Sequence, residues 1–220
     1  MQVQTYNPLW GSHDFGKEIA MKTVYLVRHS KPLKVDNALN NDSIQIQNEK
    51  SSLSMDGEKM AQEKFNSDEF SNIDVLYSSN YVRAIQTAKY IADKNNIEIN
   101  IVSDFGERKH GISSWDELPK DFELKQFNDE NYKINNGESQ KEVRERMYNA
   151  LIKVLADNKR IVIVSHATAI MYLLGIWCNI SYDGNSTFNG KIFFDGKWDY
   201  CESFKLVLDD NNNLVSIVNI

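Results

Sequence analysis

The stretch MKTVYLVRHS, residues 21–30, decides the fold. Its apolar run TVYLV (23–27) is β-branched and aromatic, a composition typical of a buried strand. Two basic side chains, Arg28 and His29, follow this run at once. Similar runs occur later in the chain at 73–77 (IDVLY), 97–102 and 160–165 (RIVIVS). The sequence therefore predicts four short strands, and the first leads directly into charged residues.

Helical patterns separate these runs. Ser54 is placed to cap a helix that continues to Asn66, and Ser139 with Glu142 has the spacing of a capping box. Two further helices are expected, one from about Asn80 and one from the end of the fourth run through Trp177. Because strands alternate with helices, the fold class is predicted to be α/β, with a mostly parallel sheet covered on both faces. The tail, residues 202–208 and 214–220, is typical of a hairpin and adds an antiparallel edge strand.

Composition excludes several classes of protein. The 220 residues include 25 Lys and Arg against 31 Asp and Glu, so the net charge is −6 and the chain lacks the basic balance of a protein that coats nucleic acid. The longest apolar stretch, residues 169–178, is shorter than a bilayer requires, so no membrane partner is expected. Cys178 and Cys201 lack metal-ligand spacing and fit free thiols in a cytoplasmic protein.

The first twenty residues differ from the rest of the chain. They are polar and aperiodic, and they contain no apolar core of the kind that a signal peptide has. We therefore expect residues 1–20 to be an N-terminal extension and residues 21–220 to form one catalytic domain.

Five ionisable side chains fall at the carboxyl ends of the predicted strands. They are Arg28 and His29 after the first strand, Arg83 in the helix after the second, Glu107 beyond the third and His166 directly after the fourth. The reactive crevice of an α/β sheet lies beyond the carboxyl ends of its strands, so we expect the five to converge there. A single arginine or histidine is more often structural than catalytic, but five complementary groups at one edge indicate a reactive site.

These groups have the chemistry of phosphoryl transfer. Arg28 and Arg83 form an anion receptor that matches phosphate, and the N-terminal amides of the two following helices are expected to point at the same anion. A histidine beside two cations stays neutral, so His29 is the candidate nucleophile and would form a phosphohistidine. Glu107 would protonate the leaving oxygen and then deprotonate water, and His166 would stabilise the equatorial oxygens. No metal or cofactor is expected, because the cationic pocket already neutralises the transferred group.

The same residues lie in motifs that resemble the histidine phosphatase superfamily, which includes the cofactor-dependent phosphoglycerate mutases. The similar segments are VYLVRH (24–29), LSMDG (53–57), YSSNYVRAIQTA (77–88), Glu107-Arg108 with Gly111, NGES (136–139) and VSHA (164–167). The resemblance implies a three-layer α/β/α sandwich in which His29 is phosphorylated and Glu107 is the proton donor. It also implies that Arg28, Arg83 and His166 bind phosphate.

Two departures from the family pattern concern the pocket wall. Ser30 stands where many members have glycine, which predicts a reshaped wall, and Ala167 replaces another glycine. The asparagine that many members place after the first histidine has no clear counterpart. His110 is a weaker candidate for substrate contact.

The leading interpretation is a metal-independent phosphatase of a small phosphomonoester. Residues 115–132 are short and acidic, and they form either a helical lid over the crevice or a solvated helix packed elsewhere. Mutases of the family have a longer insertion and a more basic pocket here, which favours the phosphatase. A phosphoglycerate mutase and a non-catalytic phospho-ligand binder remain alternatives. The partner is a small phosphorylated molecule whose leaving group the sequence does not identify, and oligomeric state stays open.

Overall fold

The computed structural model describes residues 21–36, 40–155 and 160–220. The expected extension, residues 1–20, lies outside the described residues. The strands are β1 (Lys22–Arg28), β2 (Val75–Ser78), β3 (Ile99–Ile101), β4 (Arg160–Ser165), β5 (Asn179–Ile180), β6 (Asn185–Phe188), β7 (Lys191–Asp195), β8 (Ser203–Leu208) and β9 (Leu214–Asn219). The α-helices are α1 (Ile44–Lys50), α2 (Met55–Phe65), α3 (Val82–Asn95), α4 (Phe122–Asn128), α5 (Gln140–Val154) and α6 (Ala167–Leu174). Short 3₁₀ helices are η1 (Asp68–Phe70), η2 (Ser103–Phe105) and η3 (Trp115–Glu117).

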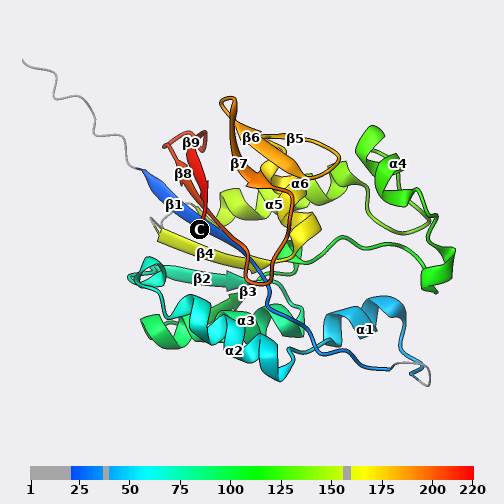
Figure 1. The fold of residues 1–220 in the computed structure, drawn as a ribbon, viewed down its shortest axis with the longest axis horizontal. Helices are drawn as coiled ribbons and strands as arrows, with labels where there is room; N and C mark the ends of the chain where they lie inside the picture. Colours follow the sequence, from blue (N-terminus) through cyan, green and yellow to red (C-terminus); the bar gives the residue numbers. More distant parts are fainter. Residues whose placement is uncertain (1–20, 37–39, 156–159) are drawn as a thin grey trace, which may run out of the picture.

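The central sheet has six strands in the order β3-β2-β4-β1-β8-β9 (Figure 1). The first four are mutually parallel, and β1 pairs with β4 from Thr23 opposite Arg160 to Arg28 opposite Ser165. Strand β8 pairs antiparallel with β1, and β9 pairs antiparallel with β8. The predicted mostly parallel sheet is confirmed, and the terminal hairpin contributes both of its strands to the antiparallel edge.

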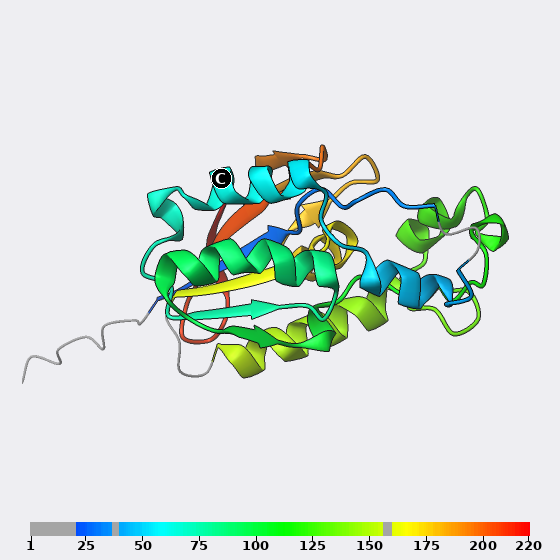
Figure 2. The same ribbon diagram turned by 90° about the horizontal axis from the view of Figure 1, so that it is seen from below.

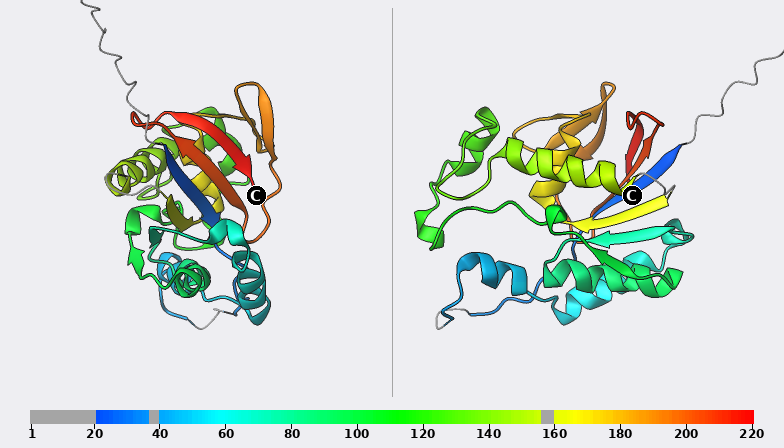
Figure 3. Two further views of the ribbon diagram at one scale, coloured as in Figure 1. Left: turned by 90° about the vertical axis from the view of Figure 1, so that its left-hand side faces the viewer. Right: turned by 180° about the vertical axis from the view of Figure 1, so that it is seen from behind.

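Helices cover both faces of this sheet, which gives the three layers seen in Figures 2 and 3. Alternate residues of β1 divide between the two cores, as the pleat of a strand requires. Val24 and Leu26 pack in the cluster that includes α5 and α6, whereas Tyr25 and Val27 pack in the cluster that includes α2 and α3. All four are fully buried, so both faces of the strand hold the layers together.

The helix starts follow their caps. The Ser54 hydroxyl accepts the amide of Gly57 at the start of α2. The predicted capping box between Ser139 and Glu142 is present at the start of α5. A Cβ built on Gly57 would lie 2.1 Å from the carbonyl oxygen of Lys31, so a glycine here lets α2 pack directly on the chain that leaves β1.

Three elements differ from the sequence prediction. Helix α6 ends at Leu174 rather than at Trp177. Its C-cap residue, Gly175, donates its amide to the carbonyl of Met171. The polar segment after β1 contains α1, which the hydrophobic pattern does not reveal. A second sheet, β5-β6-β7, follows α6, and Phe194 anchors it against Phe204 of β8.

The carboxyl ends of β1, β2 and β4 point toward the side of the molecule on which α1 and α4 lie (Figure 1). Across the described ranges, we find no helix with the length and apolar character needed to cross a bilayer.

Candidate active site

Three strand ends bring the predicted residues together. Arg28 is the last residue of β1 and His29 follows it, with the His29 amide donating to the carbonyl of Ser165 over 3.0 Å. His166 follows β4 directly and is the N-cap of α6. At the end of β2, the amide of Ser79 donates to the carbonyl of Val164 over 3.0 Å. The parallel register of β1, β4 and β2 therefore fixes where these side chains start.

Arg83 joins the two histidines. Its Nε donates to Nε2 of His29 over 3.0 Å, and its Nη2 donates to Nδ1 of His166 over 3.2 Å. The two imidazole centroids are 5.1 Å apart. The remaining Nη1 donates to the carbonyl of Asn48 in α1. One guanidinium thus contacts both rings, and the convergence predicted from strand order is confirmed for these three residues.

The hydrogen bonds fix the tautomer of each ring. Nδ1 of His29 lies 2.7 Å from the carbonyl oxygen of Ser30, which only accepts, so Nδ1 carries the proton and Nε2 holds the lone pair. His166 has the opposite tautomer. Its Nδ1 accepts from Arg83, so Nε2 carries the proton and lies 2.9 Å from the Ser79 hydroxyl. The ring edge of Tyr81 packs on His166, with centroids 4.5 Å apart.

Both rings are held neutral. Burial lowers the pKa of His29 well below its ordinary value, and the positive charge of Arg83 lowers it further. Burial also lowers the pKa of His166, assisted by His29 and Arg83. A neutral ring whose lone pair is on Nε2 is the form in which histidine acts as a nucleophile once Arg83 releases this nitrogen.

Arg28 lies near the cluster, where its charge also lowers the pKa of His29. Its Nη1 donates to the carbonyls of Trp198 and Asp199 over 2.9 and 3.2 Å, and its guanidinium stacks 4.9 Å from the ring centroid of Tyr200. Its Nε is buried and has no hydrogen-bond partner among the described residues. A buried donor of this kind is costly to leave unpaired, so Arg28 offers one N–H for an anion.

Glu107 is half-buried, and its carboxylate lies against the N-terminal end of α6. Its Oε1 accepts the amides of Arg108 and Ala169 over 2.8 and 3.0 Å, and its Oε2 accepts the amide of Thr168 over 3.4 Å. The Glu107 carboxylate accepts the Thr168 and Ala169 amides, so these two are not free for the anion that the sequence predicts at this helix start. The charge of Glu107 opposes the lowering of the Arg83 pKa that burial causes. Within the described ranges, Glu107 makes no hydrogen bond to either histidine.

The amide of Arg83, in the first turn of α3, is also occupied. It donates to the carbonyl of Ser51 over 3.1 Å. The Arg83 amide is therefore not free for the anion that the sequence predicts at this helix start.

Ser30 does not form the pocket wall that the sequence predicts. Its hydroxyl donates to the carbonyl of Gly57 over 2.7 Å, and its amide donates to the Thr87 hydroxyl over 2.9 Å. The Ser30 hydroxyl therefore ties the end of β1 to α2, and the Ser30 amide ties it to α3.

A cavity of about 120 Å³ adjoins this cluster. Helix α1 and the segment after Glu107 form its walls, and its lining includes Gln45, Asn48, Lys109, His110 and Trp115. Asn48 and Gln45 connect it to the cluster, because the first accepts from Arg83 and the second donates to the Tyr81 hydroxyl over 2.8 Å. Burial and then Arg108 lower the pKa of His110 to about 4, so its ring is neutral.

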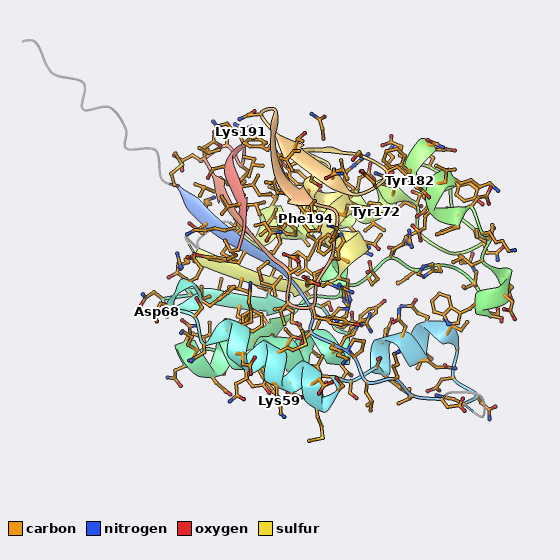
Figure 4. The ribbon with its side chains drawn as sticks, viewed as in Figure 1. Lys59, Asp68, Tyr172, Tyr182, Lys191 and Phe194 are labelled. Carbon is orange, nitrogen blue, oxygen red and sulfur yellow. The ribbon has the colours of Figure 1, made fainter. Side chains whose placement is uncertain are left out.

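A larger cavity of about 190 Å³ lies between α4, α6 and the chain after β5. Tyr172 and Tyr182, labelled in Figure 4, are among its lining residues. None of the five predicted site residues lines it. Helix α4 lines this cavity with Glu123 and Phe127, whereas Trp115 lines the smaller cavity. Of the two alternatives for the segment 115–132, the structure shows α4 at a cavity that none of the five site residues lines.

In the part of the chain that the structure describes, no group of three or more His, Cys, Asp or Glu side chains is arranged to hold a metal ion.

The neutral histidines predict a pH dependence of stability. His29 and His166 have lowered pKa values in the folded state, so below an ordinary pKa of about 6.5 the unfolded chain binds more protons than the folded one. The free energy of unfolding should be highest above this pH and should fall as pH drops below it, by up to about 1.4 kcal/mol per pH unit for each of the two. Urea unfolding between about pH 5 and 7.5 measures this. The variant His166→Asn should show a smaller slope, and an unchanged slope would contradict the assignment.

The chain matches one family model and several solved structures. The family model of the histidine phosphatase superfamily (branch 1) matches residues 24–192. No curated protein matches the chain. A mycobacterial glucosyl-3-phosphoglycerate phosphatase, Rv2419c, solved with VO3, is 15% identical with a TM-score of 0.60, and the match covers 84% of this chain and 90% of that one.

Two further solved structures are similar. Phosphoserine phosphatase from Entamoeba histolytica, solved with 3-phosphoglyceric acid, is 19% identical with a TM-score of 0.59, over 90% of this chain and 98% of that one. A putative alpha-ribazole-5'-P phosphatase from Escherichia coli is 16% identical with a TM-score of 0.61, over 90% and 96%. At these identities the likeness is one of fold.

Proposed function

This chain belongs to the histidine phosphatase superfamily, and from that premise we propose that it is a metal-independent phosphatase that hydrolyses a small phosphomonoester through a phosphohistidine intermediate. The observation that carries the proposal is the contact of one buried guanidinium, Arg83, with both imidazoles. His29 thereby presents a lone pair within a cationic pocket. Similarity to a glucosyl-3-phosphoglycerate phosphatase and a phosphoserine phosphatase supports hydrolysis of a small phosphorylated molecule.

In the first step, the phosphoryl oxygens of the substrate accept hydrogen bonds from the guanidinium groups of Arg83 and Arg28. Because Arg83 Nε donates to His29 Nε2, a phosphoryl group that draws this donor away frees the lone pair for attack. The Nε2–P bond forms as the P–O bond to the leaving group breaks. Glu107, which takes up a proton from solvent as the substrate binds, gives that proton to the departing oxygen, so the alcohol leaves neutral.

The second step reverses the roles. A water molecule attacks phosphorus, Glu107 accepts its proton, and the Nε2–P bond breaks to release inorganic phosphate. The guanidiniums stabilise the charge on the equatorial oxygens in both steps. His166 holds the Arg83 guanidinium through Nδ1 and so keeps it oriented toward the anion.

The cavity beside the cluster supports a small leaving group. Its volume is about 120 Å³, and its lining includes Asn48, whose carbonyl accepts from Arg83, and residues 109–112, which follow Glu107. We propose that the leaving group extends from the phosphoryl site into this space.

The experiment that tests this function is hydrolysis of p-nitrophenyl phosphate in excess EDTA. We expect full activity, because the guanidiniums supply the positive charge that a metal otherwise provides. Loss of activity in EDTA and its recovery with zinc would contradict the metal-independent mechanism.

A second assay separates hydrolysis from isomerisation. The protein is incubated with 3-phosphoglycerate and a trace of the bisphosphate primer. Free phosphate supports the phosphatase, whereas isomer formation without phosphate release identifies a mutase. The substrate itself is to be found by phosphate release over a panel of phosphorylated metabolites.

A further inference from the structure

An ion pair outside the phosphoryl pocket holds the segment that carries Glu107. Arg146, in the second turn of α5, donates from Nε to Oε1 of Glu138 over 2.7 Å and from Nη2 to Oε2 over 2.9 Å. Both side chains are mostly buried, with 18% and 16% of their surfaces exposed. A bidentate pair of this kind fixes orientation as well as charge.

Both partners of this pair bind the backbone around Glu107. Arg146 Nη1 donates to the carbonyls of Asp104 and Gly106 over 2.7 and 3.0 Å, and Nη2 donates to the carbonyl of Glu107 itself over 3.1 Å. On the other side, the amide of Lys109 donates to Oε2 of Glu138 over 2.9 Å. The pair therefore holds the chain before, at and after Glu107.

The surrounding backbone is irregular and approaches closely. The segment follows the short helix η2 and belongs to no strand. A Cβ built on Gly137 would lie 2.5 Å from the carbonyl oxygen of His110, which shows how tightly the residue before Glu138 packs on the segment. The ion pair thus adds side-chain hydrogen bonds between α5 and the residues around Glu107 to the backbone hydrogen bond from the Glu138 amide to the Lys109 carbonyl, 2.8 Å.

We propose that Arg146 and Glu138 are positioning residues that place the Glu107 carboxyl group for proton transfer to the leaving oxygen. This inference rests on the proposed function. Proton transfer requires a heavy-atom separation of about 2.6–3.2 Å, and a displacement of about 1 Å costs roughly 10²-fold in rate. Helix α6 holds the carboxylate oxygens through its amides, and the ion pair holds the main chain from which that side chain extends.

The test compares two substrates that differ in their need for a proton. The p-nitrophenolate group leaves as a stable anion, whereas an alkyl alcohol such as that of glycerol phosphate requires protonation as it leaves. Arg146→Met and Glu138→Gln are expected to lower kcat/KM for the alkyl phosphate by about 10²-fold and for p-nitrophenyl phosphate by less than about 3-fold. Glu107→Gln should show the same selectivity, and adding Arg146→Met to it should cause little further loss.

Arg144→Met is the matched control. Arg144 is on the same helix and forms an ion pair with Glu130, which lies outside the segment around Glu107, so both substrates should keep wild-type rates. Glu138→Gln keeps the shape of the side chain and serves if Arg146→Met does not fold. Equal loss on the two substrates, or no loss, would overturn this inference while the His29 mechanism stands. If His29→Ala keeps the hydrolysis rate of the wild type, the proposed function itself is overturned.

Discussion

The variant His29→Ala is expected to lose hydrolysis of p-nitrophenyl phosphate by about 10⁴-fold or more, because it removes the atom that attacks phosphorus. The His29 Nε2 lone pair faces the Arg83 guanidinium, and the Nδ1 proton is committed to the Ser30 carbonyl. The ring is therefore fixed with its nucleophilic atom toward the anion site. Steady-state kcat and KM for the variant and the wild type measure the effect.

A structural control accompanies this variant. His29 is buried, so circular dichroism and urea unfolding must show that the alanine variant folds. A folded His29→Ala protein that keeps more than about one-hundredth of the wild-type kcat would show that another group, or water, attacks phosphorus.

Arg83→Met is expected to lower kcat/KM by about 10³-fold, the second largest effect. This guanidinium contacts both histidines and the Asn48 carbonyl, so its loss removes phosphate binding and the connection between α3 and α1. Inhibition by inorganic phosphate should weaken in parallel. Because the charge of Arg83 contributes to the low pKa of His29, the acid limb of the pH–rate profile should also move to higher pH.

Two matched variants sharpen this prediction. Arg83→Lys keeps the charge but not the planar fork, so it should recover little activity. Lys89→Met alters another cation on α3, one that pairs with Glu58 at the surface, and should keep wild-type rates with a stability change below about 1 kcal/mol. Full activity of Arg83→Lys would show that charge alone suffices at this position.

The sequence predicts the main sheet and the strand-end residues for one physical reason. Buried parallel strands are continuous apolar runs, so β1 and β4 stand out in the printed sequence, and the residues after them must share one edge. Arg28, His29 and His166 could be placed in this way. The start of α5 was equally readable, because its capping box is a local pattern.

Contacts between distant segments could not be predicted. Helix α1 lacks a buried residue and so lacks the apolar stripe that marks a helix, yet its Asn48 carbonyl binds Arg83. The strands of the second sheet are short and join at glycines with positive φ, such as Gly184 and Gly190. The Thr168 and Ala169 amides of α6 donate to Glu107 because the chain after β3 returns to the start of this helix. No local sequence pattern encodes that contact.

Two contacts near the site, those of Ser79 and Glu138, lie in segments whose sequence pattern is visible but does not reveal the partner. Ser79 lies in the Ser-Ser pair that precedes α3, and its hydroxyl meets Nε2 of His166. Glu138 lies in the NGES segment, where the capping box draws attention to Ser139 although Glu138 binds Arg146. In both cases the pattern was visible, but the partner came from another strand or helix.

The most direct test of the account is to trap the phosphorylated enzyme. The protein is mixed with p-nitrophenyl phosphate, quenched in alkali within milliseconds, and digested for mass spectrometry. The account predicts one phosphoryl group per chain on the peptide that contains His29, assigned to its ring and absent from the His29→Ala variant. A phosphoryl group on any other residue, or active enzyme that never carries one during turnover, would contradict it.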